Sequence, residues 1–218
     1  MKFVLALWIS YFLGAIPTAY IAGRVLKDID IRKHGSGNVG ATNVFRVLGK
    51  GPGIVVLVLD ILKGVAAVTL VVDMFGLNQV GRRVLLALAA VIGHNWTVFL
   101  DFKGGKGIAT SLGALIGLAI KIAVIRPVLL FTLLAWLACF LLTGFVSLAS
   151  IIAAVFLPMI MVVTNQAFPL VVLGVVFCVF VVVRHRPNIK RLWAGEESRV
   201  PLPFLWKGGG TLPFHKKK

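Results

Sequence analysis

The chain has 218 residues, of which 59% are hydrophobic and 14% are charged, and its mean hydropathy is +1.00. A soluble domain carries about 25% charged residues, so this composition excludes a water-soluble enzyme. Lysine and arginine outnumber the acidic residues by 23 to 7, which gives a formal net charge of +16. Such an excess suits anionic lipid headgroups or anionic substrates. Nucleic acid is disfavoured as a partner because the basic residues sit on short loops between apolar runs, not on one continuous polar face.

Uncharged runs along the sequence predict an all-α, polytopic integral membrane protein with about seven transmembrane helices. A bilayer span needs ~20 apolar residues, and some of the runs are shorter than that. The first run lacks an A-x-A cleavage pattern before the polar stretch 24–33, so we expect an uncleaved helix, with a signal peptide as the alternative. The runs cover roughly residues 3–23, 53–72, 84–100, 108–120, 128–143, 146–163 and 167–183.

The distribution of basic residues predicts the orientation in the membrane. With seven spans the two ends of the chain lie on opposite sides, and most of the cations fall in the loops 24–50 and 103–106 and after residue 184. The positive-inside rule then places the N-terminus outside and the C-terminus in the cytoplasm. We divide the chain into a transmembrane domain, 1–192, and a basic cytoplasmic tail, 193–218, which we expect to be flexible and to lie at the membrane surface.

The first polar segment, residues 34–46, is rich in glycine, serine and asparagine. Next to a helix-compatible stretch, these residue types let the backbone present successive N–H donors to an anion. Residues 35–40 also spell G-x-G-x-x-G, but no hydrophobic strand precedes them, so a dinucleotide site is excluded. The alternative interpretation is an ordinary flexible loop.

The second polar segment places two lysines among three glycines directly before an apolar helix, in the order Lys103-Gly104-Gly105-Lys106-Gly107. Ammonium groups and a flexible donor backbone at the positive end of a helix favour a phosphate site. The order of a Walker A loop is absent, so ATP hydrolysis is not indicated. A simple helix connection at a lipid surface remains the alternative.

The third polar segment, residues 184–192, follows the last run and is strongly basic. Such a segment most often contacts anionic lipid, but that interpretation does not require His185 or Asn188. Within the second run, Asp60 and Lys63 lie three residues apart, which predicts an intramembrane ion pair that faces protein or a cavity. Ser147 stands at the start of the sixth run, where a serine is usually a helix cap.

The cytoplasmic loops carry no paired carboxylates, no Ser-His-Asp set and no metal-ligand spacing, and Cys139 and Cys178 lie inside apolar runs. We therefore expect no metal and no disulfide framework. Chemistry on these loops must depend on positioning and charge stabilisation, which suits a substrate that already carries a good leaving group.

Taken together and in this order, six segments resemble the signature segments of the bacterial acyl-phosphate:glycerol-3-phosphate acyltransferases. They are residues 35–43 with Arg46, 60–64, 93–94, 102–110, 146–150 and 184–189. Two positions depart from the usual pattern of that family, because residues 95–97 lack its proline and Pro187 replaces a common glutamate.

This resemblance implies a seven-helix enzyme of the bacterial cytoplasmic (inner) membrane that needs no cofactor. It would move an acyl chain from acyl phosphate to the 1-hydroxyl of glycerol 3-phosphate, giving lysophosphatidic acid and inorganic phosphate. Acyl-CoA would not be a direct donor, and an acyl-phosphate-forming enzyme would be a partner.

The resemblance also assigns roles to individual residues. Ser36, Asn38 and the backbone of 37–42 would hold the phosphoryl group of the donor, and Arg46 and Lys106 would bind the phosphate of glycerol 3-phosphate. Ser147, His185 and Asn188 would orient the glycerol hydroxyls, and the hydroxyl proton would pass to the donor phosphate, with His94 or His185 as the alternative base. The implied catalytic residues are Ser36, Asn38, His94, His185 and Asn188, and the implied substrate-binding residues are Gly37, Gly40, Thr42, Asn43, Arg46, Lys103, Gly104, Gly105, Lys106, Gly107 and Ser147.

A transporter of a phosphorylated or other anionic small molecule is the alternative from another functional class. Broken helices with glycine-rich ends hold anions in such proteins, but transporters need inverted repeats and binding groups near the bilayer midplane. The sequence shows neither feature. Its glycine-rich and basic segments are predicted at one membrane face, which favours chemistry at the interface.

Overall fold

The structure, a computed structural model, describes residues 1–200 and is entirely helical over that range, as expected from the apolar runs. Most of the predicted tail, residues 201–218, lies outside the described part of the chain. Three short 3₁₀ helices lie in connections: η1 (Ile31–Lys33), η2 (Val98–Leu100) and η3 (Ala123–Ile125). The α-helices are α1 (Lys2–Ala15), α2 (Thr18–Lys27), α3 (Ala41–Val47), α4 (Lys50–Val68), α5 (Leu70–Phe75), α6 (Val80–Asn95), α7 (Ile108–Lys121), α8 (Arg126–Thr143), α9 (Val146–Val163), α10 (Phe168–Arg184) and α11 (Arg186–Trp193).

Each of the seven predicted runs falls on a helix, but not every one has the length of a full span. Within the described residues, five helical segments are long and apolar enough to cross a bilayer, and α10 with α11 makes a sixth that is bent by 59°. The remaining run forms α7, whose 14 residues extend only ~21 Å, less than the ~30 Å of a hydrocarbon core. The five full-length segments are Lys2–Lys27, Lys50–Phe75, Val80–Leu100, Ala123–Thr143 and Val146–Val163.

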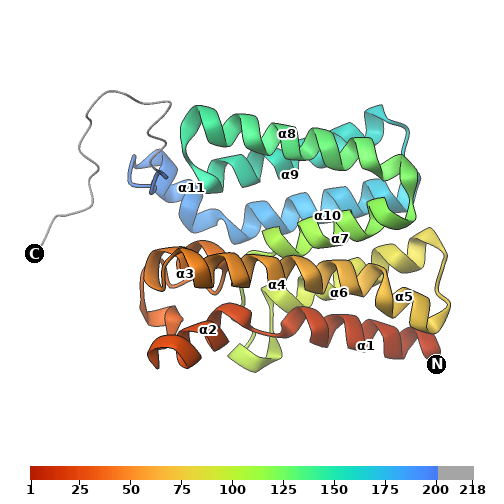
Figure 1. The fold of residues 1–218 in the computed structure, drawn as a ribbon. Coiled ribbons are helices and arrows are strands. Elements are labelled where there is room, and N and C mark those ends of the chain that lie inside the picture. Colours follow the sequence, from red (N-terminus) through yellow and green to blue (C-terminus); the bar gives the residue numbers. More distant parts are fainter. Residues whose placement is uncertain (201–218) are drawn as a thin grey trace, which may run out of the picture.

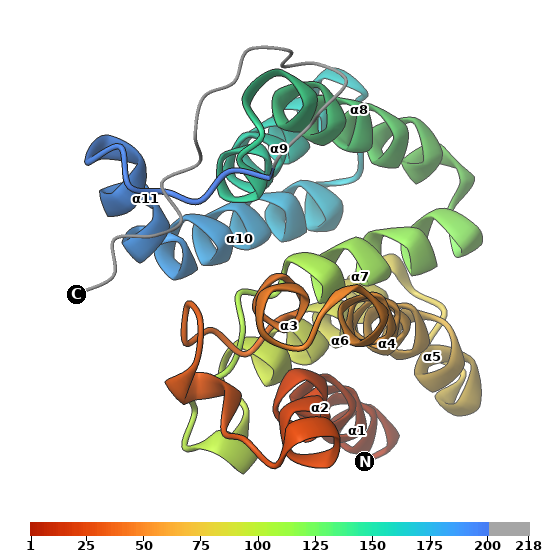
Figure 2. The same ribbon diagram turned by 60° about the vertical axis from the view of Figure 1, so that its left-hand side comes forward.

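The helices form two groups (Figures 1 and 2). In the first, α9 packs on both α8 and α10, and the second comprises α1, α4, α5 and α6. The groups are joined by α7, which packs on α4, α6 and α8, and by the contact of α10 with α6. The polar segments lie at one end of the molecule, where α2, α3 and α11 are found together, and the N-terminus lies at the other end (Figure 1).

Glycines allow the closest helix contacts. A Cβ atom on Gly64 of α4 would lie 2.1 Å from the carbonyl oxygen of Thr110, and one on Gly113 of α7 would lie 1.9 Å from that of Ile61. Small residues at such crossings let helix backbones approach in a membrane, where packing and not hydrophobic transfer drives association. The α4–α7 contact therefore fixes the second polar segment, at the start of α7, relative to α4.

A break at Ile16 and Pro17 separates α1 from α2. The residue before a proline is disfavoured in the helical region, and Ile16 accordingly has φ −52° and ψ 114°. The break leaves backbone carbonyls free for side chains of other helices. Thr97 Oγ1 donates to the oxygen of Ala15 at 2.6 Å, and Lys63 Nζ donates to that of Ile16 at 2.9 Å. The first span is thus tied to α4 and to the connection that follows α6.

Candidate functional site

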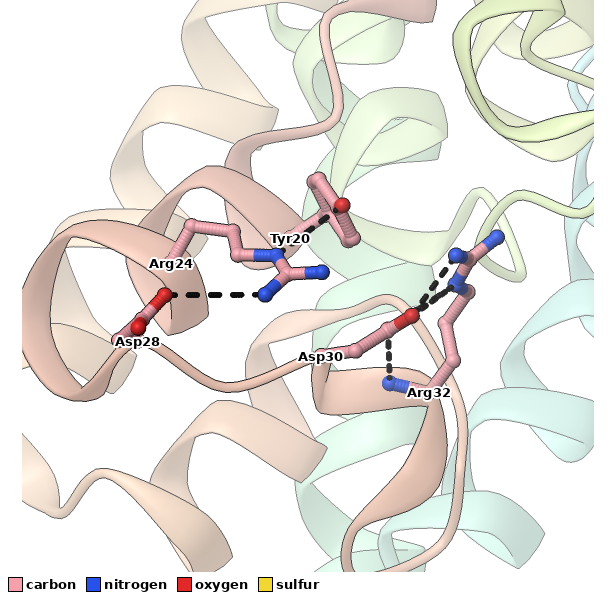
Figure 3. A network of polar contacts seen from close by, with 5 residues as sticks. All are labelled: Tyr20, Arg24, Asp28, Asp30 and Arg32. Atoms are coloured by element: carbon pink, nitrogen blue, oxygen red, sulfur yellow. Dashed lines mark hydrogen bonds and ion pairs between the residues drawn. The ribbon is translucent and has the colours of Figure 1, made fainter.

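A network of charged and aromatic side chains orders the loop that leads into the first polar segment (Figure 3). Asp30 accepts hydrogen bonds from the backbone N–H of Arg32 and from its guanidinium at 2.7–3.1 Å. Arg24 donates to the hydroxyl of Tyr20 at 3.1 Å and lies 3.7 Å from Asp28, and the guanidinium carbons of Arg24 and Arg32 both lie over the Tyr20 ring. The guanidinium of Arg32 lowers the pKa of the Asp30 carboxyl to about 2. These contacts fix the point from which the glycine-rich segment departs.

Asn43 fastens the glycine-rich segment to the start of α3. Its Oδ1 accepts from the backbone N–H of Ser36 at 2.8 Å, and its Nδ2 donates to the carbonyls of Ile31 and His34 at 3.2 and 3.0 Å. Gly35 has φ +60°, and a Cβ there would lie 2.3 Å from Asn43 Oδ1. Because the Asn43 side chain is buried and its amide is occupied by the loop, its geometry indicates that it positions the loop. The segment is therefore not an unrestrained connection.

The side chains of Ser36, Thr42, Arg46 and Lys103 are exposed at this end of the molecule. Asn38 is half-buried, Gly37 has φ +70°, and Gly40 is the residue that precedes α3. Ser36, which is predicted to hold the phosphoryl group of the acyl donor, thus lies at the surface, whereas Asn43, which holds the shape of the segment, is buried.

The glycines of the second polar segment pack against the end of α6. The N–H groups of Gly104 and Gly105 donate to the carbonyls of Asn95 and His94 at 3.2 and 3.0 Å. A Cβ on Gly104 would lie 2.1 Å from the His94 carbonyl oxygen, and one on Gly105 would lie 2.1 Å from His94 Nε2. These glycines therefore permit the close approach of one backbone to another, and their N–H groups serve the fold. We expected them to approach a ligand.

Arg184, at the end of α10, connects the second and third polar segments. Its Nε donates to the carbonyl of Gly105 at 2.9 Å, and its Nη2 donates to that of Gly104 at 2.6 Å. The guanidinium also lies over the ring of Trp96, 5.8 Å from its centroid. Arg184 of the basic segment is thus hydrogen-bonded to the second polar segment. A segment that only contacts lipid would not need these bonds.

Lys106 and Asn188 meet at the centre of this region, although 82 positions separate them in the sequence. Lys106 Nζ donates to Asn188 Oδ1 at 2.5 Å, and Asn188 Nδ2 donates to Glu197 Oε1 at 2.6 Å. The same Glu197 oxygen accepts from Ser147 Oγ at 2.8 Å, and Glu197 Oε2 accepts from Arg191 Nε at 2.7 Å. Three polar side chains thus converge on one carboxylate, and Lys106 joins them through Asn188.

Two expectations change here. The cap interpretation of Ser147 is wrong, because α9 begins after Phe145 without a side-chain cap and the Ser147 hydroxyl is directed to Glu197. Sequence reasoning also missed Glu197 itself, which it placed in a featureless basic tail. The available signal was the pair Glu196-Glu197, two of only seven acidic residues in the chain, directly after the most basic segment.

Burial and charge set the titration of Lys106. Removal from water lowers the pKa of its ammonium from 10.5 to about 8, with Arg191, Arg46 and Arg184 adding to the decrease and Glu197 opposing it. Burial would raise the pKa of the Glu197 carboxyl, but the hydrogen bonds from Asn188, Ser147 and Arg191 outweigh burial and hold it below 4.5. Lys106, Arg184 and Arg191 outnumber the single carboxylate of Glu197 in these contacts, so the centre carries excess positive charge.

Within α4, the predicted pair of Asp60 and Lys63 is confirmed as a buried ion pair. Lys63 Nζ lies 2.8 Å from Asp60 Oδ1, and their side chains are 5% and 2% exposed. Asp60 Oδ1 also accepts from Thr18 Oγ1 at 2.6 Å, and Lys63 Nζ lies 3.3 Å from Nδ1 of His94. The pair therefore joins α2, α4 and α6, and it holds the imidazole of His94.

An apolar groove runs between the first span and α4, and Lys63 of this pair is among its lining residues. Its volume is about 720 Å³, and apart from Thr18 and Lys63 its lining is apolar, from Leu13 to Leu26 on one side and from Pro52 to Ala66 on the other. Ile16 and Thr18 also line a small second pocket together with Val39, His94, Thr97, Gly104 and Gly105. The groove thus leads from an apolar surface to the glycine-rich segments.

The chain is similar to glycerol-3-phosphate acyltransferases over nearly its whole length. The family model described as glycerol-3-phosphate acyltransferase matches residues 4–195. Glycerol-3-phosphate acyltransferase 2 of Moorella thermoacetica is 46% identical over 198 residues, which cover 90% of this chain and 97% of that protein. The glycerol-3-phosphate acyltransferase of Gloeobacter violaceus is 42% identical over 202 residues, covering 91% of this chain and 96% of that protein.

Two solved structures share this fold. The glycerol 3-phosphate form of PlsY (YgiH), an integral membrane glycerol 3-phosphate acyltransferase, has a TM-score of 0.82, 38% identity, and coverage of 92% of this chain and 96% of that one. The lysophosphatidic acid form has a TM-score of 0.79 at the same identity and coverage. The similarity extends from α1 through α11 and therefore includes all three polar segments.

Proposed function

Because this chain belongs to the glycerol-3-phosphate acyltransferase family and is a multi-pass integral membrane protein, we propose that it uses acyl phosphate as its acyl donor. The acceptor would be the 1-hydroxyl of glycerol 3-phosphate, and the products would be lysophosphatidic acid and inorganic phosphate. The observation that carries this proposal is the 2.5 Å contact between Lys106 and Asn188, which joins the second and third polar segments in a centre rich in cations.

Two phosphorylated reactants suit the excess of positive charge at this centre. Arg46 and Lys106 would bind the phosphate of glycerol 3-phosphate by charge-assisted hydrogen bonds. Ser147, His185 and Asn188 would orient its hydroxyls, and the backbone around Ser36 would hold the donor phosphoryl group. Such a site accelerates the reaction by positioning its substrates and neutralising charge, not through a dedicated nucleophile.

The apolar groove supports a donor with a long acyl chain. A chain lying between the first span and α4 would reach the small pocket beside Gly104 and Gly105 through the shared residues Ile16 and Thr18. Its phosphate would then emerge next to the glycine-rich segments. An acyl phosphate is a mixed anhydride with a good leaving group, so the departing phosphate can accept the hydroxyl proton of the acceptor.

We further propose the bacterial cytoplasmic membrane as the location, with the N-terminus outside and the polar segments facing the cytoplasm. The cations gathered where α2, α3 and α11 lie support this orientation. Glycerol 3-phosphate would then arrive from the cytoplasm, and an enzyme that forms acyl phosphate would supply the donor at the same face.

Purified protein in detergent, given labelled glycerol 3-phosphate with either palmitoyl phosphate or palmitoyl-CoA, tests the donor. We expect labelled lysophosphatidic acid and free phosphate with palmitoyl phosphate alone. Equal or faster product formation from palmitoyl-CoA would contradict the assigned donor. Labelled glycerol 3-phosphate that accumulates unchanged in vesicles holding the protein would instead favour the transporter.

Replacing Lys106 with alanine should raise the KM for glycerol 3-phosphate by about tenfold or more. The change removes a charge-assisted contact worth roughly 1.5 to 3 kcal/mol, while the groove for the donor is untouched. Steady-state kinetics with each substrate varied in turn measure this. An unchanged KM for glycerol 3-phosphate would remove Lys106 from the acceptor site.

The activity should also depend on pH through Lys106. With a pKa of about 8 in the free enzyme, its side chain is charged below that pH and neutral above it. The substrate phosphate has its second pKa near 6 and stays dianionic, so kcat/KM for glycerol 3-phosphate should fall as the pH rises through about 8.

Two variants sharpen this pH measurement. Lys106→Arg keeps a charge at every pH and should abolish the decrease. Glu197→Gln removes an anion that raises the pKa of Lys106, so it should move the decrease to lower pH. A decrease that stays at the same pH in both variants would assign the titration to another group.

A further inference from the structure

The ammonium group of Lys63 has a complete set of acceptors. Its Nζ lies 2.8 Å from Asp60 Oδ1, 2.9 Å from the carbonyl oxygen of Ile16 and 3.3 Å from His94 Nδ1. A lysine ammonium carries three N–H donors and no acceptor. Two of these N–H groups point to the oxygens of Asp60 and Ile16, which can only accept. The third N–H therefore donates to His94 Nδ1, which is the acceptor nitrogen of the ring.

This arrangement selects one tautomer of His94. A neutral imidazole has one protonated nitrogen and one acceptor nitrogen, and the partner of either nitrogen decides which is which. If Nδ1 accepts from Lys63, the proton of the neutral ring lies on Nε2. A protonated ring would place a second N–H against the ammonium, which the short contact opposes.

Nε2 of His94 faces the small pocket at the inner end of the groove. A Cβ added to Gly105 would lie 2.1 Å from this nitrogen, so the missing side chain of Gly105 makes room for the imidazole edge. His94 lines that pocket with Thr18, Val39 and Gly105, and it is only 8% exposed. Within residues 1–200 no hydrogen bond from Nε2 is formed. A ring N–H that lines a pocket and has no partner among these residues is available to a ligand that accepts a hydrogen bond.

The second buried histidine of the site has the opposite arrangement. His185 Nδ1 lies 2.8 Å from the carbonyl oxygen of Val181, which can only accept, so Nδ1 carries the proton and Nε2 is the acceptor in the neutral ring. The two histidines therefore differ in what they offer to a substrate. His94 offers a hydrogen-bond donor, and His185 offers a lone pair.

We infer that His94 Nε2–H donates a hydrogen bond to the carbonyl oxygen of the acyl donor and does not act as a base. The inference rests on the proposed acyl-phosphate donor. The glycerol hydroxyl oxygen forms a bond to the carbonyl carbon, and the electron pair of the C=O bond moves onto the carbonyl oxygen. When the C=O bond reforms, the bond from carbon to the phosphate oxygen breaks, and the phosphate leaves with the hydroxyl proton.

The carbonyl oxygen gains negative charge during this step, so a fixed donor stabilises the transition state more than the ground state. The fixed position comes from the ion pair, because Lys63 holds Nδ1 while Asp60 and Ile16 hold Lys63. Since the imidazole remains neutral, this N–H adds no formal charge beside the groove that must admit an apolar chain.

Nitrogen NMR on protein with ¹⁵N-labelled histidine tests the tautomer directly, because protonated and unprotonated ring nitrogens have distinct chemical shifts. The His94 signals are assigned by their loss in His94→Gln. We expect a protonated Nε2 and an unprotonated Nδ1 at neutral pH. A proton on Nδ1 would overturn the inference, whatever the activity of the enzyme.

Two unreactive probes test which oxygen accepts. A long-chain 2-oxoalkyl phosphonate carries a carbonyl one methylene group away from its phosphorus, where acyl phosphate has the bridging oxygen, and the alkyl phosphonate of equal length lacks that carbonyl. The Nε2–H resonance should shift with the first probe and not with the second. A shift of equal size with both probes would move the contact to the phosphoryl group and overturn the carbonyl assignment.

A matched pair of variants separates a donor from a base. His94→Gln supplies an amide N–H and an acceptor but no base, whereas His94→Glu supplies a base without an N–H. We expect kcat with palmitoyl phosphate to fall by less than about tenfold in His94→Gln and by ~10²-fold or more in His94→Glu, as for removal of an oxyanion donor. The reverse order would establish a base.

Thermal unfolding of both variants in detergent identifies a loss of activity that arises from loss of the fold. If wild-type protein makes no product from palmitoyl phosphate, the proposed donor fails, and the assignment to its carbonyl oxygen fails with it. If wild-type protein turns over but the probes or variants give the opposite result, only the inference about His94 fails.

Discussion

Gly105→Ala should reduce kcat/KM by ~10²-fold or more while the protein remains folded in the membrane. The new Cβ would lie 2.1 Å from His94 Nε2 and 2.8 Å from the carbonyl oxygen of Val39. Neither neighbour can move freely, because Lys63 holds the imidazole and Val39 is buried backbone. Displacement of a reacting group by about 1 Å is enough for a loss of this size. Kinetics with both substrates and thermal unfolding in detergent measure the two effects.

Gly81→Ala is the matched control for this substitution. Gly81 lies in the first turn of α6, and a Cβ there would meet nothing within 4 Å. Alanine is favoured over glycine in a helix by up to ~1 kcal/mol, so this variant should be as stable as wild type or slightly more stable, and fully active. Near-normal activity in Gly105→Ala would show that the His94 imidazole can move aside for the new Cβ atom. It would then contradict the inference that the ring has a fixed position.

Breaking the ion pair between Asp60 and Lys63 should have the largest effect on stability. Asp60→Leu or Lys63→Met leaves the remaining charge buried and unpaired, which costs about 3 to 5 kcal/mol. The double variant leaves no unpaired charge, so it should recover much of that loss and give a strongly favourable coupling energy. Chemical denaturation of the four proteins in detergent completes the cycle.

An exposed ion pair in the same chain supplies the comparison. Lys121 and Asp73 contact each other with side chains that are 31% and 46% exposed, so Lys121→Met should cost less than about 1 kcal/mol. The double variant Asp60→Leu, Lys63→Met should remain inactive even where its stability recovers, because no side chain of the ion pair then orients His94. Full activity in the double variant would reduce the ion pair to a structural role.

The apolar periodicity and the charge asymmetry predicted the helices and the polar segments because these depend on local composition. A run without charges must leave water, and the cations at its ends must stay near water, whatever the neighbouring helices do. The pair of Asp60 and Lys63 was predictable for a similar reason, since two opposite charges one helical turn apart in an apolar run can reach each other whatever surrounds them. Predicting this contact required no knowledge of the packing.

The glycines show where sequence reasoning about the site was incomplete. Glycine at Gly104 and Gly105 indicated a close approach, but the sequence could not say whether the approaching group was a ligand or a backbone. In the fold it is the end of α6. Asn43 is a similar case, because its amide could serve a substrate or a loop, and only the positions of Ile31, His34 and Ser36 show that it holds the loop.

What the sequence by itself determined is an all-helical membrane chain with three polar segments, two rich in glycine and the third strongly basic, and one intramembrane ion pair, because each of these features is local along the chain. Only the tertiary structure decided that Glu197 returns to Ser147 and Asn188, and that Lys63 faces His94. Those facts depend on contacts between residues tens of positions apart, and they follow from the helix crossings that small residues permit and from the break at Pro17.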